Sequence, residues 1–239
     1  SALNLNVGTL RATSSFTLNS ARTITLGASG GTLEAVYPAS LAVNGEITGN
    51  GDLRTGGEGN VTLAHANSFT GTTTVLDSDG TLTLGNSNAL QNSTLTTTGS
   101  LRFGSLTNAT IGAISGTSIY QNLLLENDSN AAVALTVGGN NATTTHIGVI
   151  SGSGSLTKTG SGTLTLTGTN TYTGSTTISG GTLSAADATQ LGTGAIAINN
   201  GGALEFSTAP VYLARPVTID GSGSRLTGPD NDSPAADPT

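Results

Sequence analysis

The chain has 239 residues, of which 9% are charged and 3% aromatic, and it contains 35 glycines but no Cys, Met or Trp. A net charge of −7, with only seven Lys and Arg, excludes the basic surface that nucleic acids or anionic membranes require. Without large side chains, a stack of many similar layers of Leu, Ile, Val and Thr is a better expectation than one globule. The lack of Cys excludes disulfides and thiolate metal sites, and it suits a protein that is exported unfolded.

No apolar run approaches the roughly 18 residues of a membrane-spanning helix, so this stretch is expected not to span a membrane. Residues 1–10 lack the basic start and apolar middle of a signal peptide. An export signal would therefore have been removed or would lie outside this sequence.

The first repeated element in chain order is a short block that occurs once near each end of the chain. Arg22–Leu26 is answered by Arg215–Ile219, 193 residues later, and each is followed by a glycine-rich turn. We therefore predict one repeat domain over 1–227. Residues 228–239 are rich in Pro and Asp and have no strand pattern, so they are predicted to be a tail or linker.

A longer repeat lies inside this domain, with one copy at about 47–103 and another at about 150–206. Ile47–Leu53 returns as Ile150–Leu156, an offset of 103 residues. The same offset matches Val61, Leu63, Asn67 and Phe69 to Leu164, Leu166, Asn170 and Tyr172. Two extra residues near 77–79 shift the offset briefly, as loops between stacked layers would tolerate.

Within each unit the apolar residues alternate with Thr, as in Thr163–Leu166, which predicts short half-buried strands. A β-sandwich or a barrel would also use many short strands. Here, however, Gly-Gly and Asn-Gly pairs fall at irregular distances, while similar aliphatic clusters return after roughly 20 residues. We therefore predict an all-β solenoid of parallel strands with roughly twelve coils.

Residues 154–183 carry the most specific pattern in the sequence. Gly160–Leu166, Asn170–Gly174 and Gly181–Leu183 resemble the passenger-associated transport repeat of bacterial autotransporters, and the flanking blocks resemble autotransporter-associated β-strand repeats. The copy at 47–103 departs from this pattern, with Thr55 in place of Lys158 and Phe69 in place of Tyr172. The resemblance implies a right-handed parallel β-helix that is exported to the surface of a Gram-negative-type bacterium.

Few residues have the spacing of a catalytic or metal site. His65 and His146 are the only histidines and neither has a second ligand nearby in sequence, so both are expected at Thr-like surface positions. Ser161 between two glycines lacks the full pattern of a nucleophile elbow and the helix that follows one. We therefore predict no catalytic, cofactor-binding or metal-binding residues in this sequence.

β-Helical polysaccharide lyases and hydrolases are the enzyme alternative, because they place carboxylates along a groove. The acidic group in the body of the chain consists of Asp52, Glu58, Asp77 and Asp79. Its place in repeat turns favours solvated loops over a catalytic pair. Few aromatic side chains are expected at the surface, which weakens the case for sugar stacking; the tyrosines are Tyr37, Tyr120, Tyr172 and Tyr212.

Asp77–Gly80 and Glu126–Asp128 have the oxygen ligands that Ca²⁺ prefers, but neither matches a known calcium-loop spacing, and both are predicted to be plain turns. Two matched pairs are predicted to be structural. Asn67 and Asn170 are expected to hydrogen-bond the backbone at a turn of the coil, and Phe69 and Tyr172 to fill a corner of the core.

The first functional hypothesis is a non-catalytic passenger or stalk segment used for adhesion or surface structure. Its expected partners are neighbouring repeats, copies of itself, and glycans or proteins of a host or environmental surface. The alternative is a self-assembling extracellular filament subunit. A β-helical polysaccharide lyase or hydrolase is the third hypothesis.

Overall fold

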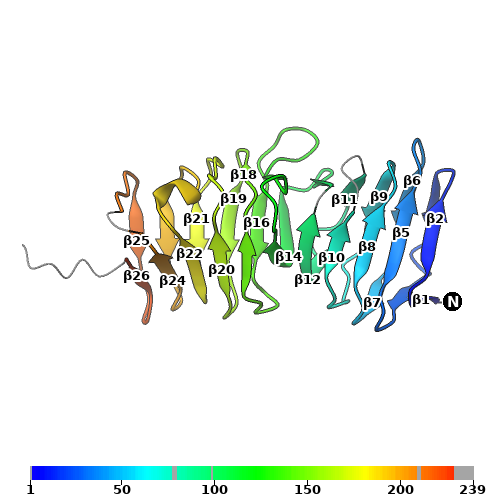
Figure 1. The fold of residues 1–239 in the computed structure, drawn as a ribbon, viewed down its shortest axis with the longest axis horizontal. Coiled ribbons are helices and arrows are strands. Elements are labelled where there is room, and N and C mark those ends of the chain that lie inside the picture. Colours follow the sequence, from blue (N-terminus) through cyan, green and yellow to red (C-terminus); the bar gives the residue numbers. More distant parts are fainter. Residues whose placement is uncertain (1, 77–79, 98, 209–210, 229–239) are drawn as a thin grey trace, which may run out of the picture.

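The computed structural model describes residues 2–76, 80–97, 99–208 and 211–228. They form an elongated parallel β-solenoid of about ten turns, with the coils stacked along the long axis of Figure 1. Every pair of named strands is parallel, which excludes the sandwich alternative for this part of the chain. The predicted tail at 228–239 falls outside the described residues apart from Gly228.

The longest sheet runs the full length of the rod and has eleven strands. In spatial order these are β2 (Thr9–Ala12), β5 (Gly31–Ala35), β8 (Leu53–Gly56), β10 (Thr73–Val75), β12 (Leu90–Thr97), β14 (Asn108–Ser115), β16 (Ala134–Val137), β19 (Ser155–Lys158), β21 (Thr176–Ile178), β23 (Ile196–Ile198) and β25 (Val217–Ile219).

The other sides of the coil are built from four shorter sheets. One five-stranded sheet has β3 (Phe16–Leu18), β6 (Ser40–Val43), β9 (Asn60–Leu63), β11 (Thr81–Leu84) and β13 (Ser100–Arg102). The second has β17 (Thr144–His146), β20 (Thr163–Leu166), β22 (Thr182–Ala185), β24 (Ala203–Phe206) and β26 (Arg225–Thr227). The small sheets contain β1 (Leu3–Leu5), β4 (Ile24–Leu26) and β7 (Ile47–Gly49), and β15 (Leu123–Leu124) with β18 (Ile150–Ser151).

The alternating sequence pattern explains the core. In β11 and β20 the Leu side chains are buried and the Thr side chains half-buried, as expected for strands with one face inward. Register stacks like on like, so Val61 lies beside Leu82 and Leu82 beside Leu101. One continuous aliphatic column therefore runs through the rod, and η1 (Ala188–Gln190) is the only helix among the described residues.

The turns repeat as faithfully as the strands. Gly57 and Gly160 are equivalent in the two copies, and both have a left-handed backbone, with φ of 78° and 66°. A Cβ on Gly160 would lie 2.0 Å from the carbonyl oxygen of Gly138 in the preceding coil. Gly160 beside Ser161 thus makes a tight corner between β19 and β20, where a larger residue would push the coils apart.

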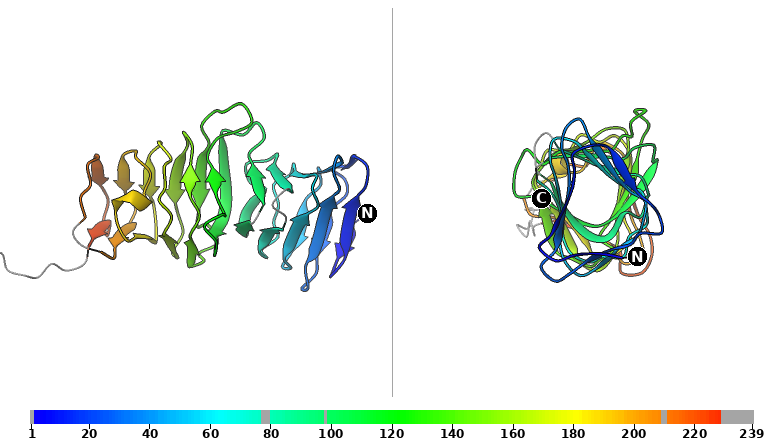
Figure 2. Two further views of the ribbon diagram at one scale, coloured as in Figure 1. Left: turned by 45° about the horizontal axis from the view of Figure 1, so that its top comes forward. Right: turned by 90° about the vertical axis from the view of Figure 1, so that its right-hand side faces the viewer.

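The turn count is lower than the roughly twelve coils predicted, because several coils are longer than 20 residues. Thr9 pairs with Thr32, and Asn108 pairs with Ala134, 26 residues later. The longest departure surrounds the loop between β14 and β15, which projects beyond the other coils in Figure 1 and in the end-on view of Figure 2. The first five-stranded sheet ends at β13, just before this loop.

Candidate functional site

Asn67 and Asn170 link three successive coils from inside the solenoid. Oδ1 of Asn170 accepts the backbone N–H of Ile150 at 2.7 Å, and its Nδ2 donates to the carbonyl of Gln190 at 2.6 Å. Asn67 bonds Ile47 and Ala89 in the same way, at 2.8 and 2.9 Å. Both side chains are buried, so the predicted structural role of this pair is confirmed.

The aromatic residue two positions after each Asn fills the core, as predicted. Phe69 and Tyr172 are buried, with 1% and 0% of their surface exposed. The Tyr172 hydroxyl lies 2.6 Å from Oγ1 of Thr176, and burial raises the pKa of Tyr172 to about 12. In the other copy Thr73 instead bonds Ser93, at 2.8 Å, because Phe69 has no hydroxyl.

Lys158 is buried inside the coil rather than on its surface. It stands in register between Val137 and Ile178, and its Nζ donates to the carbonyls of Thr159 at 2.5 Å, Gly160 at 3.3 Å and Gly180 at 3.4 Å. Burial lowers the pKa of its ammonium group. The ammonium group therefore satisfies backbone carbonyls at the corner of the coil that follows β19.

The two histidines differ in their surroundings. His65 is half-buried, and its Nδ1 lies 2.6 Å from the carbonyl of Ala66. The prediction of a surface position is wrong for His146, which is only 3% exposed because its side chain points inward from β17. Neither ring nitrogen of His146 has a hydrogen-bond partner, and burial lowers its pKa to about 4.

The carboxylates proposed for an enzyme do not form a described cluster. Asp52 precedes β8 and Glu58 follows it, and both are exposed; Asp77 and Asp79 lie outside the described residues. Oδ1 of Asp52 accepts the backbone N–H of Thr72 in the next coil at 2.8 Å. Ser161 is an exposed turn residue between two strands, with no helix after it.

The two segments weighed as calcium loops, and predicted to be plain turns, can be compared only in part. Residues 77–79 of the first lie outside the described part. In the second, Oε1 of Glu126 accepts the N–H of Ser153, Asn127 Oδ1 caps the N–H groups of Ser129 and Ala131, and Asp128 pairs with Arg102 at 3.0 Å. No group of three or more His, Cys, Asp or Glu suited to a metal occurs among the described residues.

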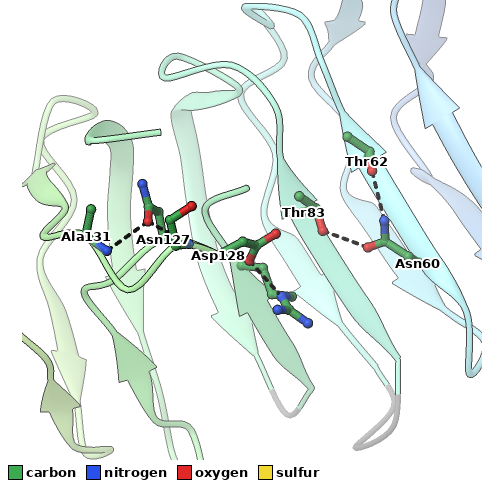
Figure 3. A network of polar contacts seen from close by, with 8 residues as sticks. Asn60, Thr62, Thr83, Asn127, Asp128 and Ala131 are labelled. Carbon is green, nitrogen blue, oxygen red and sulfur yellow. Dashed lines mark hydrogen bonds and ion pairs between the residues drawn. The ribbon is translucent and has the colours of Figure 1, made fainter. Parts of the chain in front are cut away.

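A groove that the sequence did not predict lies beside the projecting loop. It has a volume of about 720 Å³ and is bounded by β11, β13, the loop with Tyr120 and Asn122, and the turn Glu126–Asn130. A smaller hollow of about 310 Å³ adjoins it along Asn60, Thr83 and Arg102. Figure 3 shows the polar side chains that cross these strands. The departure of 116–131 from the repeat spacing was the only sequence signal for this site.

The tyrosines also divide between core and surface. Tyr37, Tyr120 and Tyr212 are 71%, 81% and 83% exposed, whereas Tyr172 is buried. The surface therefore has aromatic rings available for contact, and Tyr120 is the one that lines the groove.

Comparison with known proteins identifies the repeat. The model of the passenger-associated transport repeat matches residues 53–84 and 156–185, which lie within the two copies found in the sequence. No curated protein and no solved structure matches the chain. None of the helices in the described part is long and apolar enough to cross a membrane. Two segments of the chain therefore match the transport repeat. Together with the β-solenoid, they have the features of an autotransporter passenger repeat protein.

Proposed function

We propose that this chain is a non-catalytic rod segment of a passenger, displayed outside a Gram-negative-type bacterium, where it serves adhesion or surface structure. The observation that carries the proposal is the continuous core, crossed from coil to coil by buried Asn67 and Asn170. Each coil contacts mainly its neighbours, so such a solenoid can fold progressively as it emerges and gain length coil by coil. The two transport repeats support export.

The carboxylates of the described residues support the non-catalytic part of the proposal. Asp52 and Glu126 hold backbone N–H groups of the next coil, and Glu46 accepts the Ser68 hydroxyl at 2.6 Å. Arg11, Arg102 and Arg225 pair with Glu34, Asp128 and Glu205. A glycosidase needs two carboxyl groups that converge on one bond. These carboxylates instead connect neighbouring coils.

The test is to incubate the purified chain with neutral and acidic polysaccharides, measure new reducing ends or unsaturated products, and image the protein by negative stain. We expect rods and no product above a no-protein blank. A cleavage activity that Asp52→Asn or Glu126→Gln abolishes, while the rods persist, would contradict the proposal.

The filament alternative would join copies of the chain through the last described coil. Ile219 of β25 and Leu226 of β26 are 49% and 37% exposed, and the outer edges of these strands have no partner strand in the described part. A further coil, either from the same chain or from a copy, would cover them. For a filament, light scattering should show a mass that grows with concentration and falls in Ile219→Lys; a constant single-chain mass would count against it.

A further inference from the structure

We propose that the groove beside β13 binds a neutral oligosaccharide. This inference rests on the proposed surface role and names the class of ligand. The groove lies at the one place where the coil departs most from its repeat, between the end of the first five-stranded sheet and the loop 116–131. Such a departure adds a concave wall to an otherwise regular rod.

The wall is held firmly to the coils on either side. The N–H of Asp128 donates to the carbonyl of Gly104 in the preceding coil at 2.8 Å. On the other side, Oδ1 of Asn122 accepts the N–H of Val149, and Oε1 of Glu126 accepts that of Ser153, both at 2.9 Å. A preformed groove costs little ordering entropy when a ligand binds.

Size and exposure suit a small chain molecule. The volume of about 720 Å³ is within the range of small-ligand sites, and the adjoining hollow of about 310 Å³ shares Thr81, Arg102 and Asp128 with it. Together the two hollows cross β9, β11 and β13 along the rod axis. The spacing of about 4.8 Å between paired strands is close to the length of one sugar unit in an extended chain.

The side chains around the groove are those that recognise sugar hydroxyls. Oδ1 of Asn60 accepts the Thr83 hydroxyl at 2.7 Å, and Nε of Arg102 lies 3.0 Å from Oδ1 of Asp128. Figure 3 labels Asn60, Thr83 and Asp128 and draws both contacts. Among the described residues nothing else holds the terminal nitrogens of Arg102 or Oδ2 of Asp128. The planar groups of Arg102 and Asp128 therefore stand side by side, which suits adjacent hydroxyl groups.

Apolar contact comes from the projecting loop and from β15, which follows it. Tyr120 is 81% exposed and Leu124 is 50% exposed, and both line the groove. An aromatic ring contributes a large apolar surface with few rotatable bonds, against which the C–H face of a sugar can pack. An exposed ring beside planar polar groups is the combination that an uncharged, hydroxyl-rich ligand requires.

Charge and topology disfavour the competing ligands. The groove is lined by one guanidinium, of Arg102, and two carboxylates, of Glu126 and Asp128, so its net negative charge disfavours phosphates and uronic acids. An added peptide strand would need the backbone edge of β13, but the turn at Asp128 lies beside this strand, bonded to the Arg102 side chain and to the carbonyl of Gly104 just after it.

The test is calorimetric titration of the whole chain with the hexaoses of β-1,4-linked glucose, α-1,4-linked glucose and β-1,4-linked N-acetylglucosamine, with hexagalacturonate as the anionic control. We expect at least one neutral hexaose to bind and hexagalacturonate not to bind. Tyr120→Ala and Arg102→Ala should each weaken that binding about tenfold. Tyr212→Ala removes a similarly exposed ring between β24 and β25, near the last coil, so it should leave the affinity unchanged.

Thermal melting of each variant shows whether it is folded, and Asp128→Asn is a further, more conservative variant that should also weaken binding. The inference is overturned if none of the neutral hexaoses binds, if hexagalacturonate or a peptide library binds instead, or if Tyr120→Ala and Tyr212→Ala have the same affinity. If no hexaose binds, this inference fails but the proposed non-catalytic role is unaffected. If the titration forms cleavage products, the non-catalytic role itself is contradicted.

Discussion

Lys158 and Thr55 occupy equivalent inward-facing positions in the two repeat copies, but only Lys158 has partners for its polar atom. Its ammonium group donates to three backbone carbonyls, while the Thr55 hydroxyl is buried without a hydrogen-bond partner. A buried polar group that is left unpaired costs free energy, so the copy with Thr55 is the weaker of the two at this corner.

Replacing Thr55 with Val should stabilise the protein. The methyl group fills the space of the unpaired hydroxyl, and we expect the free energy of unfolding to rise by about 1 kcal/mol. Urea denaturation followed by circular dichroism measures the change. Thr157→Val, on the half-buried outer side of β19, is the matched control and should change stability by no more than about 0.5 kcal/mol. An equal effect at both positions would refute the explanation.

Replacing Lys158 with Met should have the opposite effect. Met keeps most of the apolar stem but leaves the carbonyls of Thr159, Gly160 and Gly180 without this donor, so we expect a loss of about 2 kcal/mol. The same denaturation experiment measures it. Unchanged or increased stability would show that burying the ammonium group costs as much as its hydrogen bonds contribute.

Replacing Asn170 with Ala should weaken the contacts among three coils. The substitution leaves the N–H of Ile150 and the carbonyl of Gln190 buried and unpaired, for an expected loss of about 2 to 4 kcal/mol. Hydrogen exchange should show loss of protection first in β18 and in the strands beside it. Asn50 is exposed and provides the control, since Asn50→Ala should leave exchange and melting temperature as they are.

His146 should make the fold sensitive to acid. Its pKa is about 4 in the folded chain, against an ordinary value of 6.5 in the unfolded chain, so between these pH values the unfolded chain binds the proton that the folded chain does not. Above about pH 6.5 His146 does not reduce the free energy of unfolding. As the pH falls from 6.5 through 4, the free energy of unfolding decreases by about 3 kcal/mol in all because of this group.

The measurement is the difference in unfolding free energy between pH 7 and pH 4.5, with and without His146→Leu. The substitution should reduce that difference, because it removes the group whose pKa is lowered by burial. Carboxylates in general also titrate in this pH range, so the comparison between the wild type and the variant is the decisive quantity. An identical pH slope in the wild type and His146→Leu would exclude His146 as the cause.

Much of the repeat chemistry was predictable because it is local or recurs at a fixed offset. The alternation in Thr163–Leu166 indicates a strand with one buried face, and Asn170 with Tyr172 matches Asn67 with Phe69, which marks them as structural. His146 was misjudged because strand β17 lies after the irregular loop. No alternating pattern around it shows which face points inward.

Repetition in the sequence alone was enough to establish stacked parallel coils, because each unit must bury the same inward positions against a similar neighbour. The groove and the environment of His146 depended on tertiary structure. Arg102 and Asp128 are 26 residues apart, and their pairing depends on how the loop 116–131 folds back across β13, which neither repeat copy encodes. Burial on one face recurs along the chain and can be read from it, whereas a contact made once, by an irregular loop, depends on the packed fold.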